Sequence, residues 1–580
     1  MAVRSALAEA WLMQDDLAQA ASALGRPPSG IREPISDARL STLWRLHGRI
    51  TYARGEQSRA IALHARALKH AELAHDSRAI GLAHYELAHC YRHVGESGIV
   101  RDHLTEAASA LHAAGDRRHL ALVHSLSGIL MAQAGRYDEA ASALRQGERL
   151  AMAIQADDVL AGIVHNQANV ALMQHRFDQA LSMAERSVTL HESLGSGHGL
   201  AVALATLGQI LVQLGDLERA EKTLTRTLEV PSPVQFHETT GAVFDTLAQI
   251  HLMRGSYERA GEYLRQASDA YAEHGSTAIR WYEWSLRVLG VKLAIRRGDH
   301  EKAIAIAEEM VGTPNVPPSD AIQAELAACE ALVAGGRTRE AETRLDACEA
   351  RMDPRSAPAS WGEFLRIRGT VHEQSNRPAA AHHDFAQSAS VFDLVGERYH
   401  AALSHLALGR LAVKGSHRSA AERYLNQAST TFGTLGAEHD LREVEALRVL
   451  LNEAPRDQPV VFPDQDDAVV RRLVDAANLP DLLARETATS LLETIAADAA
   501  VVFTATPGGE VRIAAAAGCD NDVARALARA ALQGNTWYAG SIVMTEPLGR
   551  DYDGPRSCTV VAAGGFTGSA GRRLPLLTRG

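Results

Sequence analysis

Histidine is the residue type with the widest chemical range in this chain, which contains 26 of them. An imidazole can ligate a metal ion or exchange a proton near neutral pH. His382 and His383 are adjacent, and His89 lies close to His93. A metal site needs several ligands that converge at fixed geometry, and no H-E-x-x-H run or Cys/His set accompanies these histidines. We therefore expect no resident metal, and we expect most of the histidines to be surface or packing residues.

The sequence gives no stronger signal for a catalytic nucleophile or a phosphate-binding loop than for a metal site. The cysteines are far apart in the sequence: Cys90, Cys329, Cys348, Cys519 and Cys558. Without a C-x-x-C pair they indicate neither a disulfide framework nor a thiolate metal site, and a reducing compartment fits them best. The GSGHG run at 195–199 lacks the preceding strand and the following lysine of a phosphate-binding loop. Since no nucleophile can be paired with a base, the sequence predicts a protein that is not an enzyme, with no catalytic residue and no cofactor.

Charge and hydropathy indicate which partners and which cellular compartment to expect. The formal net charge is −11 and there is no long basic run, so the sequence does not favour a nucleic acid as the main partner. Glu9, Asp15 and Asp16 interrupt the apolar core that a signal peptide needs. No later window reaches the ~18 consecutive apolar residues typical of a membrane span. We expect a cytoplasmic protein that contacts neither a membrane nor nucleic acid directly.

An internal repeat predicts the elements that position the polar side chains. The run GRYDEA at 135–140 recurs as HRFDQA at 175, GDLERA at 215 and GSYERA at 255. Equivalent reference sites follow at steps of 40 residues, and of 43, 38, 40 and 39 at the end: Asp15, Gly55, Gly95, Gly135, His175, Gly215, Gly255, Gly298, Gly336, Asn376 and Gly415. Self-similarity at a period of this size indicates a solenoid built from stacked units.

Each unit is predicted to be a helix, a short turn and a second helix. Apolar residues recur at three- and four-residue spacings through 200–214, stop at the GD turn, and resume through 217–228. Five residues after the reference site ten of the eleven units carry alanine, as at Ala140 and Ala220. Seven residues before it most units carry a small residue, such as Gly128 and Gly208. The last unit carries Leu408 at this place. Small residues let the two antiparallel helices approach closely, and the turn glycine can end the first helix in a left-handed conformation.

This pattern resembles the tetratricopeptide repeat (TPR). The apolar site after the turn is Leu104, Leu144, Leu224, Leu264, Leu345, Phe385 and Tyr424, and the next small site is Ala67, Ala107, Gly147 and Ala267. The resemblance covers roughly residues 1–440 and implies a mainly α protein, a right-handed α-solenoid of about eleven TPR-like helical hairpins. The period of 40 exceeds the ~34 residues of the common repeat, which implies longer helices. Similar long repeats occur in bacterial regulatory proteins.

The resemblance also implies a concave surface, lined by the first helix of each unit, that binds a protein or peptide. The family's groove positions correspond here to Arg45, Arg49, Tyr52, Tyr85, His89, Arg92, His165, Asn169, Gln209, Asp245, Gln249 and Lys292. The three arginines and two tyrosines of the first units can bind an acidic segment through bidentate pairs and stacking. The alternative is that these are ordinary solvated helix faces. The family's carboxylate clamp is not reproduced, which argues against capture of a free C-terminus.

The C-terminal part follows a different pattern. Residues 441–453 are predicted to form a capping helix, and 454–466, which contain three prolines, a linker. Helices are then expected at 467–477, 481–497 and 523–532, with a hairpin around PGG and strands at 541–546 and 557–563. Residues 467–580 thus predict a small α+β domain.

The succession LPDLLARETATSLLETIAADAAVVFTATPGGEVRIAAAAG is similar to the opening of GAF domains, which are sensor modules of signalling proteins. The resemblance implies binding of a small molecule or a protein, but no residue of a cyclic-nucleotide or chromophore site can be matched. The ending lacks the closing strand and helix of a GAF domain, so the domain is expected to be incomplete.

The leading hypothesis is a non-enzymatic regulatory protein of bacterial signal transduction or transcription regulation. Its repeats would bind a protein partner or peptide, and its GAF-like domain would act as a sensor. One alternative is a pure assembly scaffold or adaptor whose C-terminal segment caps the array or forms a homodimer. An enzyme with its active site in 467–580 is the least favoured reading, because no nucleophile and base can be named there.

Overall fold

The computed structural model describes residues 2–13, 16–25, 35–92, 97–230, 237–274, 279–314, 316–355, 357–453, 465–477, 479–495, 499–505, 511–519, 521–532, 542–547 and 557–563. Their contacts group the chain into two compact units: Met1–Met352 with Ser429–Glu445, and Asp353–Ala428 with Ala446–Gly580. The sites Asp15 and Gly95, most of the linker 454–466 and the expected incomplete end after residue 563 lie outside the described residues. The domain boundaries expected from the sequence stay a prediction.

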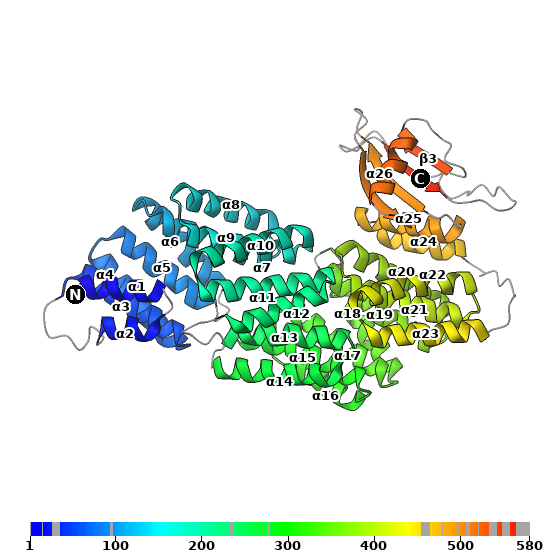
Figure 1. Ribbon diagram of the computed structural model, residues 1–580, viewed down its shortest axis with the longest axis horizontal. Coiled ribbons are helices and arrows are strands. Elements are labelled where there is room, and N and C mark those ends of the chain that lie inside the picture. Colours follow the sequence, from blue (N-terminus) through cyan, green and yellow to red (C-terminus); the bar gives the residue numbers. More distant parts are fainter. Residues whose placement is uncertain are drawn as a thin grey trace. The chain divides into compact units, whose positions relative to one another are not determined.

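The first unit contains nine consecutive helical hairpins, whose two helices lie side by side (Figure 1). The pairs are α1 (Ala2–Met13) with α2 (Leu17–Leu24), α3 (Asp37–Ala53) with α4 (Gln57–Leu73), α5 (Ser77–Arg92) with α6 (Ser97–Ala113), α7 (Arg117–Gln133) with α8 (Tyr137–Ala153), α9 (Asp157–Met173) with α10 (Phe177–Leu194), α11 (Gly197–Leu214) with α12 (Leu217–Glu229), α13 (His237–Met253) with α14 (Tyr257–His274), α15 (Ile279–Arg296) with α16 (His300–Val311), and α17 (Pro318–Ala334) with α18 (Thr338–Glu349).

The same succession continues through four more helices and ends in a single one. The elements are α19 (Pro358–Gln374) with α20 (Pro378–Val395), α21 (Arg398–Lys414) with α22 (Arg418–Leu435), and α23 (Glu438–Glu453). The described residues therefore contain eleven hairpins, as the repeat predicts. The predicted capping helix is α23, which begins three residues before the expected 441.

Left-handed residues separate the helices, and they explain the reference sites of the repeat. Gly135, Gly215 and Gly255 have φ of 74°, 80° and 77°, and His175 and Asn376 adopt φ of 55° and 56° at the equivalent places. This conformation turns the chain so that the N–H of Asp216 donates to the Leu211 carbonyl at 2.9 Å. The turns between consecutive hairpins use the same device, with φ of 69° at Gly115 and 63° at Gly195. A helix end therefore recurs about every 20 residues, and the 40-residue repeat contains two of them.

The last repeat is displaced by one residue from the predicted alignment. Gly415 has φ of −81°, whereas Ser416 has φ of 59° and is the left-handed residue. The small site facing the second helix is therefore Gly409, not Leu408, and it contacts Leu425, not Tyr424. Glycine is the residue most easily placed in this turn, so the sequence pattern favoured Gly415; the helix instead ends one residue later.

Close crossing of the two helices accounts for the small residues. A Cβ atom built on Gly208 would lie 2.5 Å from the Leu224 side chain, and one on Gly128 would lie 2.7 Å from Leu144. Ala140 and Ala220, five residues after the left-handed site, are fully buried. These contacts confirm the predicted hairpin packing, because any side chain at the two glycines would occupy the space of the leucine.

Helix α11 is long and apolar enough to cross a membrane by length and composition, which differs from the expectation that no window would qualify. Half of its 18-residue window is buried inside the protein. Its buried residues include Leu204, Leu207 and Leu211, and α12 packs alongside it. A core helix of a repeat array meets the same criterion as a membrane span, because its neighbours cover its apolar faces.

The C-terminal part forms a small α/β sandwich. After α24 (Gln465–Ala476) and α25 (Pro480–Ile495) come β1 (Ala499–Ala505), β2 (Val511–Ala517), α26 (Asn521–Leu532), β3 (Ile542–Pro547) and β4 (Ser557–Ala563). The strands form one antiparallel sheet in the order β2-β1-β4-β3. The predicted helices, hairpin and strands are all present within a few residues of their expected bounds.

Helices cover both faces of this sheet. Ala500 and Val502 of β1 pack with Ala488 of α25, whereas Val501 and Phe503 pack with α26. Successive side chains of a strand point to opposite faces, so this alternation needs an apolar cover on each side. The predicted helices and strands thus pack around one sheet, and a separate α+β domain stays a prediction. Its identity as a GAF domain stays a prediction.

Candidate partner-binding face

The twelve predicted binding residues all lie on first helices of the hairpins. Arg45, Arg49 and Tyr52 are on α3; Tyr85, His89 and Arg92 on α5; His165 and Asn169 on α9; Gln209 on α11; Asp245 and Gln249 on α13; and Lys292 on α15. All are at least partly exposed except Arg45, whose relative exposure is 7%. We call this set the first-helix face. Whether it binds a partner stays a prediction.

Two of the three arginines at the start of this face are paired with carboxylates within the protein. Arg45 Nη2 lies 2.7 Å from Glu9 Oε1 and its Nη1 lies 3.8 Å from Glu86 Oε1. Arg49 Nε lies 3.5 Å from the same Glu86 oxygen. Burial opposes ionisation of Glu9, but the hydrogen bond and charge of Arg45 outweigh it and hold the pKa of Glu9 below its usual value. The prediction that these arginines are available to an acidic segment is wrong for Arg45, which is buried in ion pairs.

Sequence reasoning missed both carboxylates, although one had a signal. Arg49 lies six residues before its reference site Gly55, and Glu9 lies six residues before Asp15. The groove alignment extended to the first repeat would therefore have placed Glu9 on the same face. Glu86 falls between two assigned groove positions, so only the packing of α5 against α3 brings it to the arginines.

Aromatic residues of α3 and α5 come together next to this cluster. The Tyr52 hydroxyl lies 3.3 Å from His89 Nδ1, and the two rings meet edge to face. Tyr85 also contacts His89 edge to face, with 5.8 Å between the ring centroids. Burial raises the pKa of Tyr85, so its hydroxyl stays protonated. The structure thus joins three of the predicted residues into one aromatic group.

The middle of the face is polar and uncharged. Asn169 Nδ2 lies 2.9 Å from His165 Nε2 one turn away on α9, and Asn166 donates to Ser125 Oγ of α7 at 2.8 Å. Burial, followed by the nearby His191 and His198, lowers the pKa of His165 to about 4. This imidazole is therefore neutral near pH 7. Gln209 on α11 is exposed.

Asp245 is the predicted acidic residue on the face. Ser285 of α15 donates to Asp245 Oδ2 at 2.6 Å, which joins α13 to α15. Burial raises the pKa of Asp245 to about 6, although the hydrogen bond from Ser285 acts in the opposite direction. Among the residues that the structure describes, no lysine, arginine or histidine forms an ion pair with this carboxylate. Gln249 lies one turn further along α13.

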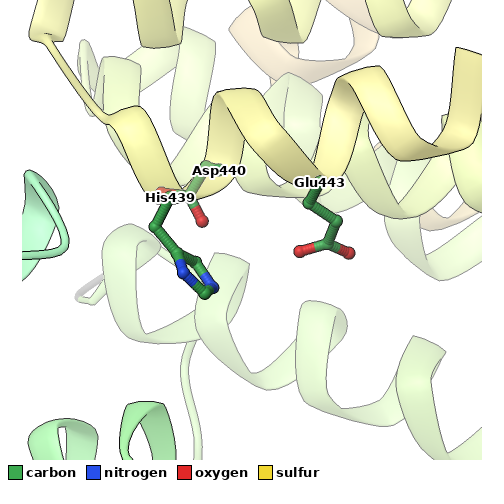
Figure 2. A group of neighbouring side chains, drawn as sticks. All are labelled: His439, Asp440 and Glu443. Atoms are coloured by element: carbon green, nitrogen blue, oxygen red, sulfur yellow. The ribbon is translucent and has the colours of Figure 1, made fainter.

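A group of metal-ligating residue types lies on α23, outside the predicted face. One ligand atom from each of His439, Asp440 and Glu443 lies within 4.8 Å of the others. Figure 2 shows the His439 and Glu443 side chains extending from the same helix. Asp440 is only 1% exposed and accepts from Arg296 Nη1 of α15 at 2.8 Å. Since that guanidinium already neutralises the carboxylate, a metal bound here would sit beside a positive charge, which weakens the case for a metal centre.

This group instead forms a contact between distant parts of the first unit. The His439 ring meets Tyr257 edge to face, with 5.6 Å between centroids. A Cβ atom on Gly255 would lie 2.8 Å from His439 Cβ, so the turn before α14 needs glycine for a second reason besides its φ of 77°. The arrangement holds the start of α23 against α15 and this turn. The sequence analysis did not find it, because no repeat periodicity relates residues so far apart.

Because of His64, we expect the protein to lose stability in mild acid. This histidine is fully buried on α4 against Gly48, and neither ring nitrogen has a hydrogen-bond partner among the described residues. Burial lowers its pKa from 6.5 to about 4. The folded state therefore favours the neutral ring. As the pH falls from 6.5 towards 4, the unfolded chain binds a proton at this ring that the folded state does not bind, so the free energy of unfolding decreases. The loss at pH 5 relative to pH 8 is about 2 kcal/mol.

The test is replacement of His64 by leucine, the residue that Leu144 and Leu224 supply at equivalent places. Hydrogen exchange of the α3 and α4 amides, corrected for intrinsic rates, measures local opening at pH 5 and pH 8. The variant is expected to show little difference between the two pH values. His112→Gln removes an exposed histidine and is the control. Equal acid sensitivity of the wild type and His64→Leu would rule out His64 as the cause.

A match to a protein family agrees with this repeat architecture. The family described as the MalT-like TPR region matches residues 94–387. No curated protein matches the chain. Among solved structures, a signal transduction ATPase with numerous domains and a tetratricopeptide repeat sensor from Pyrococcus horikoshii is 15% identical, with a TM-score of 0.38 over 58% of this chain and 52% of that one. The present chain thus spans about half the length of that protein.

Two further solved structures are similar. A tetratricopeptide repeat protein from Parabacteroides merdae is 14% identical, with a TM-score of 0.33 over 50% of this chain and 99% of that one. Aspartyl phosphate phosphatase F from Bacillus subtilis is 14% identical, with a TM-score of 0.38 over 60% and 92%. The family match spans just over half of the 580 residues and extends from α6 into α20. The chain therefore belongs to the MalT-like TPR family.

Proposed function

We propose that this chain is a non-enzymatic regulatory protein that binds a segment of a partner polypeptide along the first-helix face. The supporting observation is that polar side chains connect successive first helices while staying partly exposed. Tyr52 reaches His89, and Asp245 reaches Ser285. Stacked helical repeats commonly use such an extended surface for binding. The second helices of the hairpins supply the large buried residues, such as Leu224, that pack against the first helices.

A site-specific photo-crosslink tests this proposal. We expect a photoreactive amino acid at Gln209, on the first-helix face, to form a discrete adduct with a partner in the cells that naturally produce the protein. The same amino acid at Thr189, an exposed position on the second helix α10, is the control and is expected to form none. Adducts of equal yield from both positions, or from neither, would contradict binding at this face.

A sensor role for the C-terminal sandwich completes the proposal. The sequence similarity to GAF domains and the sheet with a helix on each face support it. In this scheme the sandwich binds a small molecule or a second copy of the chain and transmits a signal, as in bacterial signal-transduction or transcription regulators. The cysteines Cys90, Cys329, Cys348 and Cys519 form no disulfide, which fits a cytoplasmic location.

The assembly scaffold is the second candidate function. It needs only the repeat array, in which the ion pairs of Arg45 and Arg49 make one end of the first-helix face structural. An acidic partner loses its main support for the same reason. Both candidates place the partner on the first-helix face, and they differ in whether the C-terminal sandwich responds to a ligand.

A further inference from the structure

The charged residues of the first-helix face are unequally compensated. Arg45 and Arg49 are paired with Glu9 and Glu86. The carboxylate of Asp245, by contrast, receives one neutral hydrogen bond from Ser285. Within the described part of the chain no cation approaches it. Among the described side chains, the face therefore presents a carboxylate without a positive partner, on a helix where partner binding is proposed.

Burial makes this arrangement unfavourable for the free protein. A carboxylate withdrawn from water needs several hydrogen bonds or a cation to replace its hydration. Asp245 is partly buried, and burial raises the pKa of its carboxyl because it disfavours the charged form. A hydroxyl already occupies one side, so further neutral donors would add less than a positive charge.

The neighbouring groups suit a lysine or arginine side chain. Gln249 lies one turn further along α13, is partly exposed, and has no hydrogen-bond partner in the described structure. Its amide oxygen can accept from an ammonium or guanidinium group bound at Asp245. Ser285 is exposed beside the carboxylate, so the approach is open to solvent.

We propose that Asp245 binds a lysine or arginine side chain of the partner polypeptide, with Ser285 and Gln249 completing the polar contacts. This inference rests on the proposed function, since it names the chemistry of the segment that the first-helix face binds. The partner is thus basic at this point of the face, opposite in charge to the acidic segment expected from the sequence. Binding is expected to weaken below about pH 6, because the cation requires the ionised carboxylate.

Selection of peptides against the full chain tests the inference. The probe is a displayed library of random dodecapeptides, and the affinity of an enriched peptide is then measured by fluorescence anisotropy. We expect enriched peptides to share a lysine or arginine, and Asp245→Asn to weaken their binding about tenfold. The matched control is Asp269→Asn on the second helix α14, which is expected to leave affinity unchanged. Asn is isosteric and removes a poorly solvated charge, so the variant is expected to remain folded, as thermal unfolding can verify.

The outcomes separate the two proposals. Peptides that bind the first-helix face without a basic residue, or bind Asp245→Asn as tightly as the wild type, would overturn the role of Asp245 and leave the proposed function standing. Absence of any enriched peptide relative to an unrelated helical protein would overturn both. An affinity that falls between pH 7.5 and pH 5 in the wild type and not in Asp245→Asn would support the inference.

Discussion

Replacement of Glu486 by leucine is expected to lower the free energy of unfolding of the C-terminal sandwich by about 3 to 5 kcal/mol. Glu486 on α25 and Arg472 on α24 are 0% and 1% exposed. Both Arg472 Nε and Nη2 lie 2.8 Å from Glu486 Oε2. Leucine would leave the guanidinium buried without its counter-charge. Faster hydrogen exchange in α24, α25 and β1 measures the loss.

A double variant tests whether the loss of stability comes from the charge that the single variant leaves unpaired. Arg472→Met together with Glu486→Leu removes both charges, and we expect it to recover most of the lost stability, because apolar residues of similar size often replace a buried pair without cost. Asp522→Asn is the control, since it disrupts the exposed pair with Arg525 on α26. Its expected effect is below about 1 kcal/mol. A single variant as stable as the wild type would show that the pair is solvated.

The repeat architecture was predictable because it depends on local, periodic demands. Close helix crossing needs a small residue at one fixed place in each helix, and the buried Ala140 and Ala220 fill that role. The left-handed turn favours glycine, which marks Gly135 and Gly215. The same rule places the last turn one residue too early, at Gly415, because the left-handed residue there is Ser416. A serine can adopt this conformation, so the sequence pattern alone could not locate the turn.

The partners of the candidate binding residues were less predictable. Helical periodicity assigns Arg45 to a face, but its ion pairs with Glu9 and Glu86 depend on how neighbouring hairpins stack. Arg296 and Asp440 are paired across 144 residues of sequence. No periodicity encodes such a contact. The sequence therefore predicts which residues lie on the first helices, whereas the charge available there depends on the tertiary packing.

The hairpin crossing leads to the second large expected effect, at Gly208. Leucine at this position is expected to destabilise the α11–α12 hairpin by about 3 kcal/mol, the upper end of the usual cost of overpacking. A Cβ atom there would lie 2.5 Å from Leu224 Cδ2 and 2.6 Å from its Cγ. Leu224 is fully buried, so its side chain is not free to move aside as an exposed one would be. Hydrogen exchange of the α11 and α12 amides measures the change.

Two further variants distinguish a clash from a general effect of replacing helical glycine. Gly162 on α9 has no atom within 4 Å of a built Cβ, so Gly162→Ala is expected to stabilise its helix by up to about 1 kcal/mol. Gly208→Ala, with the same gain in helix propensity, is expected to destabilise because of Leu224. Gly208→Leu combined with Leu224→Ala exchanges the large and small side chains, and we expect partial recovery because the total volume is conserved. If both alanine variants stabilise equally, the close crossing does not restrict position 208, and the small residues of the repeat need another explanation.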